Sequence, residues 1–405
     1  MSEKKSFMSS IGMSALVMEL ARRAGITIGP IGSSCDIEYT DPDQFAAAAG
    51  GGSLSFGNGY MFGEWFTRDT DTLFRIVCQV IRSDIPSYFR NHWKAKLTVA
   101  FNHLFNRQNP VLSRIVAEKH YDIPISFYRL LLGPSEVYTA ALLPAASDPV
   151  SYRSHSLEEA QRMKLWRICN QLGILELRAG RRFRFLDIGC GFGSLLSFVA
   201  HECKARGVLF EGVGITNSSE HAAYVRERAK REGINVTVFE GDYRHFSTEH
   251  PFDAIASIEM IEHVGQRYLR RYMQLVHDWL KEGGKFLLQG IVGPDSMNMF
   301  DPWLDRWIFP NAMLLSHKLL GGAYEGLFRL EDSQSLRSGY VFTLLKWLEN
   351  LNANRALIEK DFDTEFFRMF QYYLATCAAT FAAGENDVIQ FTLVRGRLLP
   401  PLAAL

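Results

Sequence analysis

The sequence predicts an α/β protein whose core is a doubly wound, mostly parallel sheet, with a helical insertion and a small N-terminal domain. From about residue 180, strand-like apolar runs alternate with amphipathic helical segments, which is typical of a parallel sheet covered by helices. About 90 aromatic-rich residues then interrupt the alternation before the last strand, so we expect a lid there. The expected domains are residues 1–110 and 111–405, with the lid insertion at about 294–385.

The elements of the larger domain follow from the apolar pattern and from glycines that end helices. The expected strands are RFRFLDIG (182–189), LFEGVGIT (209–216), INVTVFEGD (234–242), FDAIASIE (252–259), GKFLLQGIVG (284–293) and DVIQFTLVRG (387–396). The expected helices are GSLLSFVAHECKAR (193–206), SSEHAAYVRERAKREG (218–233) and RYLRRYMQLVHDWLKEGG (267–284).

The N-terminal domain has a different pattern. We expect a helix at 11–23, strands at 25–32 and 35–41, and a turn region in the small-residue stretch AAAAGGGSLSFGNGY at 46–60. The chain becomes polar at 107–110, which indicates a linker.

Composition narrows the class of protein. The chain has 405 residues, no net charge and 47% hydrophobic residues, which is typical of a globular protein and argues against bulk nucleic-acid binding. Six cysteines occur without a CxxC pair, so we expect reduced thiols and neither a disulfide framework nor a metal site. Because neither a signal peptide nor an apolar run of about 18–20 residues is visible, we expect a cytoplasmic protein that meets a membrane only at its inner surface.

Glycines follow the first strand of the larger domain. Gly189 and Gly191 belong to a G-x-G-x-G run after Asp187, where a bare backbone lets a ligand approach a helix N-terminus. The run differs from the G-x-G-x-x-G of dinucleotide sites, and the next strand ends in the hydroxyls of Thr216 and Ser218 rather than in a carboxylate. A tight structural turn would need the same glycines, but the Asp before them favours S-adenosylmethionine (SAM).

The third strand supports the same cofactor. It closes with Asp242 and Tyr243, which could accept a hydrogen bond from an adenine amine and pack against its ring.

Acids gather at the end of a strand that is otherwise apolar. The stretch EMIEHVG places Glu259, Glu262 and His263 directly after FDAIASI, at the sheet edge where open α/β sheets bind ligands. A helix N-terminus, where glutamate is electrostatically favoured, is the alternative interpretation. We expect His263 to orient the loop rather than to titrate.

The chain resembles the cyclopropane fatty acid synthases along nearly its whole length. The motifs that carry the resemblance are RAGITI, GNGYMFGEW, EKHYDIP, LEEAQRMKL, FLDIGCGFGSL, GDYRHF, IEHVG, DPWLDRWIFPN and FRMFQYYLATCAATF. The resemblance implies a class I methyltransferase sheet and SAM-dependent methylation of the double bond in unsaturated acyl chains of membrane phospholipids.

The resemblance also assigns roles to residues. Glu262 and Tyr340 match residues that hold a bicarbonate ion, which acts as the base in the family. The positions implied to line the SAM site are Tyr138, Thr139, Asp187, Gly189, Gly191, Thr216, Ser218, His221, Asp242 and Tyr243.

The chain departs from the family around the bicarbonate site. Ala140 stands where the family has Cys, Gln289 where it has His, Gly339 where it has Asp, and His221 where Gln is usual. Glu259 stands where the close synthases have glycine. Under one interpretation these changes are neutral. Under the other, Glu259 replaces bicarbonate as the base, and the product is a methyl branch with an alkene rather than a ring.

The implied partners are an unsaturated phospholipid at the membrane surface and a second copy of the chain. The cluster Arg82, Arg90, His92, Lys94 and Lys96 could contact anionic headgroups or form a solvated helix face. Two other functions stay open: a SAM- or lipid-binding homologue without turnover, and a methyltransferase of a small soluble acceptor.

Overall fold

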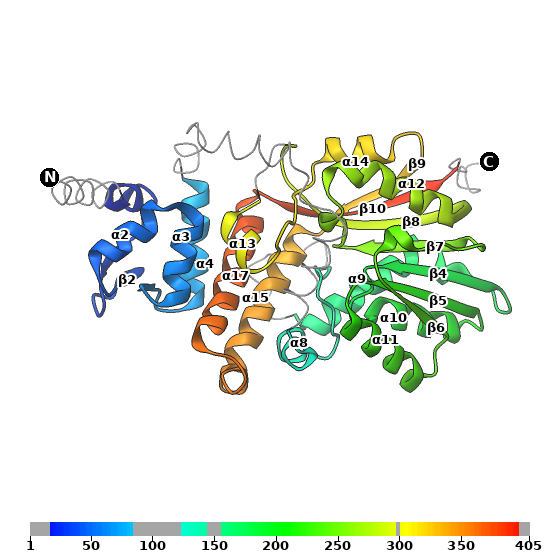
Figure 1. Cartoon of the computed structure of the whole chain (residues 1–405), viewed down its shortest axis with the longest axis horizontal. Helices are drawn as coiled ribbons and strands as arrows, with labels where there is room; N and C mark the ends of the chain where they lie inside the picture. The colour runs from blue at the N-terminus through cyan, green and yellow to red at the C-terminus, as the bar shows by residue number, and fades with distance from the viewer. Residues whose placement is uncertain (1–16, 84–122, 144–154, 297–299, 397–405) are drawn as a thin grey trace. The chain divides into compact units, whose positions relative to one another are not determined.

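A computed structural model describes residues 17–83, 123–143, 155–296 and 300–396 (Figure 1). The chain divides into two compact units. The first contains Met1–Leu104, Met299–Pro310 and Val341–Glu385, and the second contains Phe105–Asn298, Asn311–Tyr340 and Asn386–Leu405. The expected linker at 107–110 and most of the basic cluster lie outside the described residues.

The second unit is built on a seven-stranded sheet. Its order is β6-β5-β4-β7-β8-β10-β9, in which only β10 runs antiparallel to both of its neighbours. The strands are β4 (Arg182–Ile188), β5 (Leu209–Thr216), β6 (Val236–Glu240), β7 (Phe252–Ile258), β8 (Leu280–Val292), β9 (Phe328–Ser335) and β10 (Asp387–Arg395). Six of these seven strands follow the apolar runs of the sequence.

Helices cover both faces of this sheet, as the alternation predicted. One core cluster joins the sheet to α9 (Leu157–Gln171), α10 (Ser194–Ala205) and α11 (Ser219–Glu232). The other joins it to α12 (Leu269–Trp279) and α14 (His317–Tyr324), on the opposite side of the sheet in Figure 1. A short helix, α8 (Ile125–Leu132), and the 3-10 turns Ile174–Glu176, Tyr243–His245, Ile261–His263 and Gln266–Tyr268 complete the unit. The doubly wound α/β fold is confirmed.

The strand order locates the site. The connections run from β4 toward β5 and β6, and from β7 toward β8, so the order reverses between β4 and β7. Ligands of open α/β sheets bind beyond the carboxyl ends of the strands at such a reversal. The glycine run follows β4 and the acids follow β7, so both lie at this edge.

Strand β9 was not predicted, because the insertion was expected to hold only helices and loops. Its residues FRLEDSQS are mostly polar and exposed, so an apolar alternation is missing. They pair with β10 at the edge of the sheet, where a strand needs little apolar surface.

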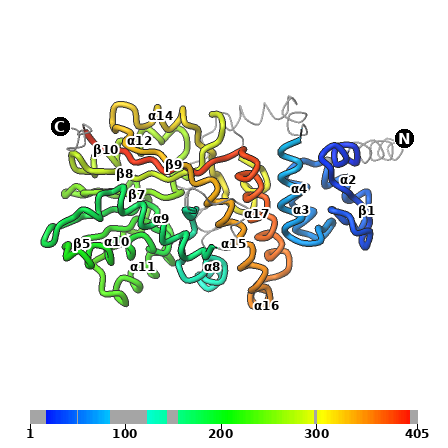
Figure 2. Tube along the Cα trace, turned by 180° about the vertical axis from the view of Figure 1, so that it is seen from behind, coloured from blue at the N-terminus to red at the C-terminus, as the bar shows by residue number. Residues whose placement is uncertain are grey.

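The first unit combines the N-terminal segment with helices of the late insertion. Three short strands, β1 (Ile28–Pro30), β2 (Ile37–Tyr39) and β3 (Trp65–Phe66), form a small sheet. Helix α17 (Thr364–Ala383) packs against α3 (Gly52–Phe62) and α4 (Thr70–Arg82), as Figure 2 shows. The unit also contains α2 (Pro42–Gly50), α13 (Pro302–Trp307), α16 (Arg355–Ile358) and most of α15 (Arg337–Ala353), and 17–23, the described part of the helix expected at 11–23, is helical. The boundary expected near residue 110 stays a prediction.

The expected turn region at 46–60 is wrong, because the stretch forms α2 and α3. Two of its glycines serve helix packing, whereas Gly52, at φ 81°, lies at the turn where α3 begins. A Cβ at Gly57 would lie 2.4 Å from Cδ1 of Trp303, and one at Gly59 would lie 2.8 Å from Cδ1 of Trp65. Both indoles are fully buried, so the missing side chains let aromatic rings lie directly on the helix.

All six cysteines are free. Within the described part of the chain, no group of three or more His, Cys, Asp or Glu side chains is placed to hold a metal ion. Among the helices described, none combines the length and apolar character that crossing a bilayer requires.

Candidate active site

The glycine run turns sharply between β4 and α10. Gly189 and Gly191 have φ values of 80° and 49°, in the left-handed region that favours glycine. A Cβ at Gly189 would lie 2.7 Å from Cγ of Met260, so the turn packs against the segment that follows β7. A Cβ at Gly191 would have no atom within 4 Å, so the loop faces open space there.

The hydroxyls at the end of β5 organise the next turn. Thr216 Oγ1 accepts a hydrogen bond from the Ser218 N–H at 3.2 Å, and Ser218 Oγ accepts one from the His221 N–H at 3.2 Å, which caps α11. Burial lowers the pKa of His221 to about 4, so this imidazole is neutral near pH 7.

The ends of β5 and β6 meet beside this turn. The Gly241 N–H donates to the Thr216 carbonyl at 2.8 Å. The carboxylate of Asp242 then binds Arg244, whose Nε lies 2.8 Å from Oδ1, and this ion pair helps to lower the carboxyl pKa against the effect of burial. Asp242 Oδ2 accepts from Arg244 and, as a carboxylate oxygen with two lone pairs, can accept from a second donor. The Tyr243 ring packs edge-on against Tyr272.

A buried lysine lies between the expected SAM-binding residues and the two glutamates. Lys164 of α9 is 1% exposed, and its Nζ donates to Thr139 Oγ1 at 2.7 Å. Gln161, one turn earlier, donates to the Thr139 carbonyl at 2.8 Å. Burial lowers the pKa of Lys164 to about 8, while Glu259 and Asp187 act to raise it. Neither Lys164 nor Gln161 was predicted, although two polar residues three apart on an apolar helix face were the available signal.

Two further predicted residues lie in this half of the site. The rings of Tyr138 and Tyr128 lie 5.3 Å apart. Asp187 is buried at the end of β4, and burial raises its pKa to about 7 against the influence of Lys164.

Glu259 has its carboxylate inside the protein. Its Oε1 accepts from the Ala140 N–H at 2.9 Å and from Gln289 Nε2 at 2.6 Å, and Tyr340 also hydrogen-bonds to the side chain. Burial raises the carboxyl pKa, whereas these three donors and the charge of Lys164 lower it. Its backbone φ is 51°, a left-handed conformation that glutamate rarely adopts.

Glu262 has fewer partners than Glu259. Its Oε1 accepts from the Ile291 N–H at 2.6 Å, while its buried Oε2 has no hydrogen-bond partner within the described structure. Burial raises its pKa to about 8, the Ile291 amide opposes this shift, and Glu259 adds to it. Glu262 is therefore mostly protonated at pH 7, whereas the neighbouring carboxyl of Glu259 accepts hydrogen bonds from three donors. The neighbouring imidazole of His263 is buried and neutral, with its pKa lowered to about 4.

The first residues of helix α15 also contact the site. A Cβ at Gly339 would lie 2.0 Å from the carbonyl oxygen of Ala141. Only glycine permits this approach, which brings the following Tyr340 to the carboxylate of Glu259 and keeps the Ala140 amide in place.

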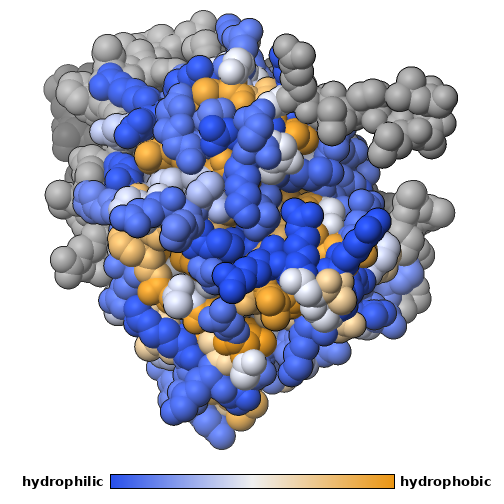
Figure 3. All heavy atoms as spheres, turned by 90° about the vertical axis from the view of Figure 1, so that its right-hand side faces the viewer, coloured by the Kyte–Doolittle hydropathy of each residue, from blue (hydrophilic) through white to orange (hydrophobic). Residues whose placement is uncertain are grey.

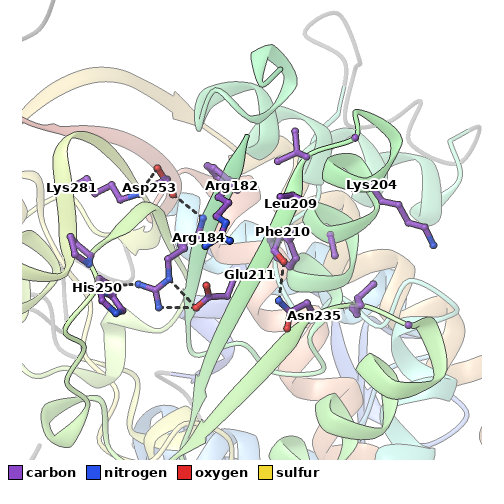
Figure 4. Close-up of a pocket in the computed structure, with 17 residues that line it drawn as sticks. Arg182, Arg184, Lys204, Leu209, Phe210, Glu211, Asn235, His250, Asp253 and Lys281 are labelled. Carbon is purple, nitrogen blue, oxygen red and sulfur yellow. Dashed lines mark hydrogen bonds and ion pairs between the residues drawn. The ribbon is translucent and has the colours of Figure 1, made fainter. Parts of the chain in front are cut away.

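A hollow lies at the other end of the strands of this sheet, away from the candidate active site. It has a volume of about 990 Å³ and is lined at the amino ends of the strands (Figure 4). Two of its cations are paired: Arg184 binds Glu211 at 2.9 Å and Lys281 binds Asp253 at 2.8 Å. Figure 3 views this end of the unit and shows hydrophilic and hydrophobic residues interspersed. The arrangement suits a solvated surface rather than a catalytic centre.

The fold and the candidate active site together define the class of enzyme. A seven-stranded sheet with one antiparallel strand next to the edge, a glycine turn after the strand at the reversal, and hydroxyls after the next strand are the features of the class I SAM-dependent methyltransferases. The family model described as mycolic acid cyclopropane synthetase matches residues 110–391. The chain belongs to this cyclopropane synthase family and is a SAM-dependent methyltransferase.

Individual relatives agree with this assignment. Cyclopropane-fatty-acyl-phospholipid synthase of Escherichia coli (strain K12) is 35% identical over 379 residues, which cover 93% of this chain and 92% of the relative. Tuberculostearic acid methyltransferase UfaA1 of Mycobacterium tuberculosis is 29% identical over 363 residues, covering 87% and 82% of the two chains. The crystal structure of mycolic acid cyclopropane synthase CmaA1 complexed with SAH and CTAB has a TM-score of 0.59 and 27% identity, over 70% of this chain and 98% of the other.

Proposed function

We propose that this enzyme transfers a methyl group from SAM to the double bond of unsaturated fatty acyl chains in phospholipids, with Glu259 as its own internal base. The observation that carries the second part is the set of donors on the Glu259 carboxylate: the Ala140 amide, Gln289 Nε2 and Tyr340. The similarity to a cyclopropane-fatty-acyl-phospholipid synthase and to a tuberculostearic acid methyltransferase supports the substrate class.

The chemistry of the side chains along the carboxyl ends of β4, β5 and β6 fits SAM. The open space over Gly191 admits a ligand beside the helix N-terminus, and the remaining capacity of Asp242 Oδ2 suits an adenine amine. The residues that would hold SAM are Tyr138, Thr139, Asp187, Gly189, Gly191, Thr216, Ser218, His221, Asp242 and Tyr243.

Bicarbonate does not fit this site as the chain is folded. Tyr340, one of the two residues that the resemblance implies would bind it, already hydrogen-bonds to Glu259, as does Gln289. A second anion beside an ionised Glu259 would also be repelled in a buried site. We therefore assign the role of bicarbonate to the carboxylate of Glu259.

Glu259 and its neighbours suit the proton transfer that must follow methylation of an alkene. SAM, when bound, supplies an electrophilic methyl group. Its addition to the double bond leaves a positive charge on the acyl chain, which the carboxylate of Glu259 stabilises. Glu259 then accepts one proton. If that proton leaves the added methyl, its C–H electrons close a cyclopropane ring, and if it leaves the adjacent chain carbon, they form a new alkene beside a methyl branch.

Glu262 and Lys164 keep Glu259 in its reactive form. A protonated Glu262 adds no second negative charge, and a charged Lys164 favours the carboxylate over the acid. The proposed catalytic group is therefore Glu259, with Tyr340 and Gln289 hydrogen-bonded to it and Glu262 acting on it through its charge.

The phospholipid substrate places the reaction at a membrane surface. We propose a peripheral enzyme at the inner face of the cytoplasmic membrane that works as a homodimer. Co-sedimentation with vesicles and light scattering of the purified protein test these two points, and a monomer that ignores vesicles would contradict them.

Mass spectrometry of fatty-acid esters tests the proposed function. The purified protein is incubated with methyl-labelled SAM and vesicles of unsaturated phospholipid. Transfer of the label to the acyl chain is expected, either with loss of the alkene, which means a ring, or with its retention, which means a methyl branch. Absence of label in the lipid would overturn the proposal and favour a binding protein or a soluble acceptor.

A further inference from the structure

We propose that Arg167, Gln390 and Gln289 form a hydrogen-bond chain of fixed direction that holds Glu259 as a proton acceptor. Arg167 and Gln390 are thus positioning residues, which act on the reaction through Gln289. This inference rests on the proposed role of Glu259 as the base.

The chain crosses three elements of the second unit. Gln390 of β10 lies directly opposite Gln289 of β8 in the antiparallel pair, and its Nε2 donates to Gln289 Oε1 at 2.8 Å. Gln289 Nε2 donates to Glu259 Oε1 at 2.6 Å. At the other end, Arg167 Nε of α9 donates to Gln390 Oε1 at 3.2 Å. The two glutamines are 0% and 1% exposed, so water does not compete for their amides.

The direction of the chain follows from the first donor. A guanidinium has only N–H groups, so Arg167 requires the oxygen of Gln390 to face it. The amide nitrogen of Gln390 must then face Gln289, which requires the oxygen of Gln289. The amide nitrogen of Gln289 is thereby turned toward Glu259. The orientation of Arg167 therefore determines that Gln289 presents an N–H donor, rather than its oxygen, to the carboxylate of Glu259.

Such a donor favours the ionised form of Glu259, because a hydrogen bond donated to a carboxylate oxygen stabilises its negative charge. The other groups that face this carboxyl are the Ala140 amide, Tyr340, the cation of Lys164 and the carboxyl of Glu262. Asp187 acts from further away through Lys164. Gln289 differs from a histidine at the same position, because an imidazole can present an unprotonated nitrogen by changing tautomer.

Arg167 is itself held from outside the site. Its Nη2 lies 2.5 Å from Asp332 Oδ2 on β9, and the arginine side chain is 20% exposed. Arg167 and Lys164 are three residues apart on α9, so one helix provides both the direct charge and the start of the chain. The pair with Asp332 supplies a matched control, because removing it leaves the Arg167 Nε donor in place.

Carbon-13 NMR of the full chain, labelled at the glutamate carboxyl carbon, tests the inference without substrate. The resonance lost in Glu259→Gln identifies Glu259, and its titration is followed with pH. Gln390→Glu reverses the chain, since the new carboxylate accepts from both Arg167 and Gln289. Gln390→Met interrupts it, and Asp332→Asn is the control.

We expect the Glu259 titration to move upward by about one pH unit or more in Gln390→Glu, by less in Gln390→Met, and not at all in Asp332→Asn. The acidic limb of turnover should move in the same order. Unchanged titration in both Gln390 variants, with native circular dichroism, would overturn the inference. So would a shift in Asp332→Asn as large as in Gln390→Met. Full turnover by Glu259→Gln would instead refute the proposed base, while the titration would still report on the chain.

Discussion

Glu259 combines an unfavourable backbone with a favourable set of partners. A left-handed conformation costs a non-glycine residue about 1–2 kcal/mol. The residue persists at φ 51° because Ala140, Gln289 and Tyr340 bind its carboxylate. Strain of this kind concentrates at functional sites, where the surrounding structure determines one conformation.

Glu262→Gln should retain turnover near pH 7, because a neutral amide replaces a protonated carboxyl, and it should stabilise the fold at alkaline pH. The pKa of Glu262 is raised from 4.5 to about 8 in the folded protein. The contribution of this carboxyl to the free energy of unfolding is therefore complete below pH about 4.5 and is lost as the pH rises through 8. An amide does not ionise, so thermal unfolding at pH 8.5 should occur roughly 3 °C higher in the variant than in the wild type. At pH 5 the two melting temperatures should differ much less.

Calorimetry at both pH values checks this expectation, with labelled SAM as the measure of turnover. Loss of turnover near pH 7 in the variant, or a stability gain that is equal at both pH values, would contradict the role given to Glu262.

The sequence was sufficient to place the acids but not their network. Glu259 and Glu262 were predicted because polar residues directly after a buried strand are unusual. Gln390 lies inside the apolar run DVIQFTLVRG, and Lys164 lies on a helix face that is otherwise apolar. A buried polar side chain is recognisable only when its partner is known, and the partners here come from distant elements.

At the scale of elements, the start of α15 must lie directly on the segment that contains Ala140. Gly339 has no Cβ to collide with the Ala141 carbonyl, and Tyr340 follows it into the site. The close contact therefore couples the position of this helix to two of the donors on Glu259.

Gly339→Ala should lower both stability and activity. A helical glycine replaced by alanine normally stabilises a protein by about 0.5–1 kcal/mol. Here the new Cβ would lie 2.0 Å from a backbone oxygen, so the segment at Ala140 must move. We expect a loss of about 1–3 kcal/mol, as for other overpacked sites, and at least a tenfold loss in kcat.

Gly321→Ala in α14 is the matched control, because its Cβ would meet no atom within 4 Å. It should be neutral or stabilising in chemical denaturation. If Gly339→Ala behaved like this control, the contact between α15 and the Ala141 carbonyl would not position the site.

Elements with strong patterns were predictable, and elements defined by their neighbours were not. The buried strands β4, β5, β7 and β8 carry their own apolar signal. Strand β9 depends on its pairing with β10, and α3 depends on Trp65 and Trp303 lying over its glycines. In both cases tertiary contacts outweigh local propensity.

For the whole molecule, the buried ionisable groups predict a bell-shaped pH dependence. Glu262 gains a negative charge and Lys164 loses a positive one near pH 8, and both changes disfavour the catalytic arrangement. Turnover should therefore fall above pH about 8 with a dependence on more than one proton. Toward acidic pH it should fall again as Glu259, whose pKa is raised by burial, takes up a proton.

A pH series of initial rates under saturating SAM and lipid checks this profile. Lys164→Met should reduce the alkaline limb to a single proton. A rate that stays constant from pH 7 to 10 would contradict the assignment of these two groups.

The most direct test of the central claim is the dependence of turnover on bicarbonate. Turnover by the wild type and by Glu259→Gly is measured in buffer freed of carbon dioxide, with and without added bicarbonate. We predict that the wild type needs no bicarbonate, and that the glycine variant, which also relieves the strained backbone, is inactive until bicarbonate restores part of its turnover. Loss of wild-type turnover on removal of bicarbonate would contradict the claim that Glu259 is the base.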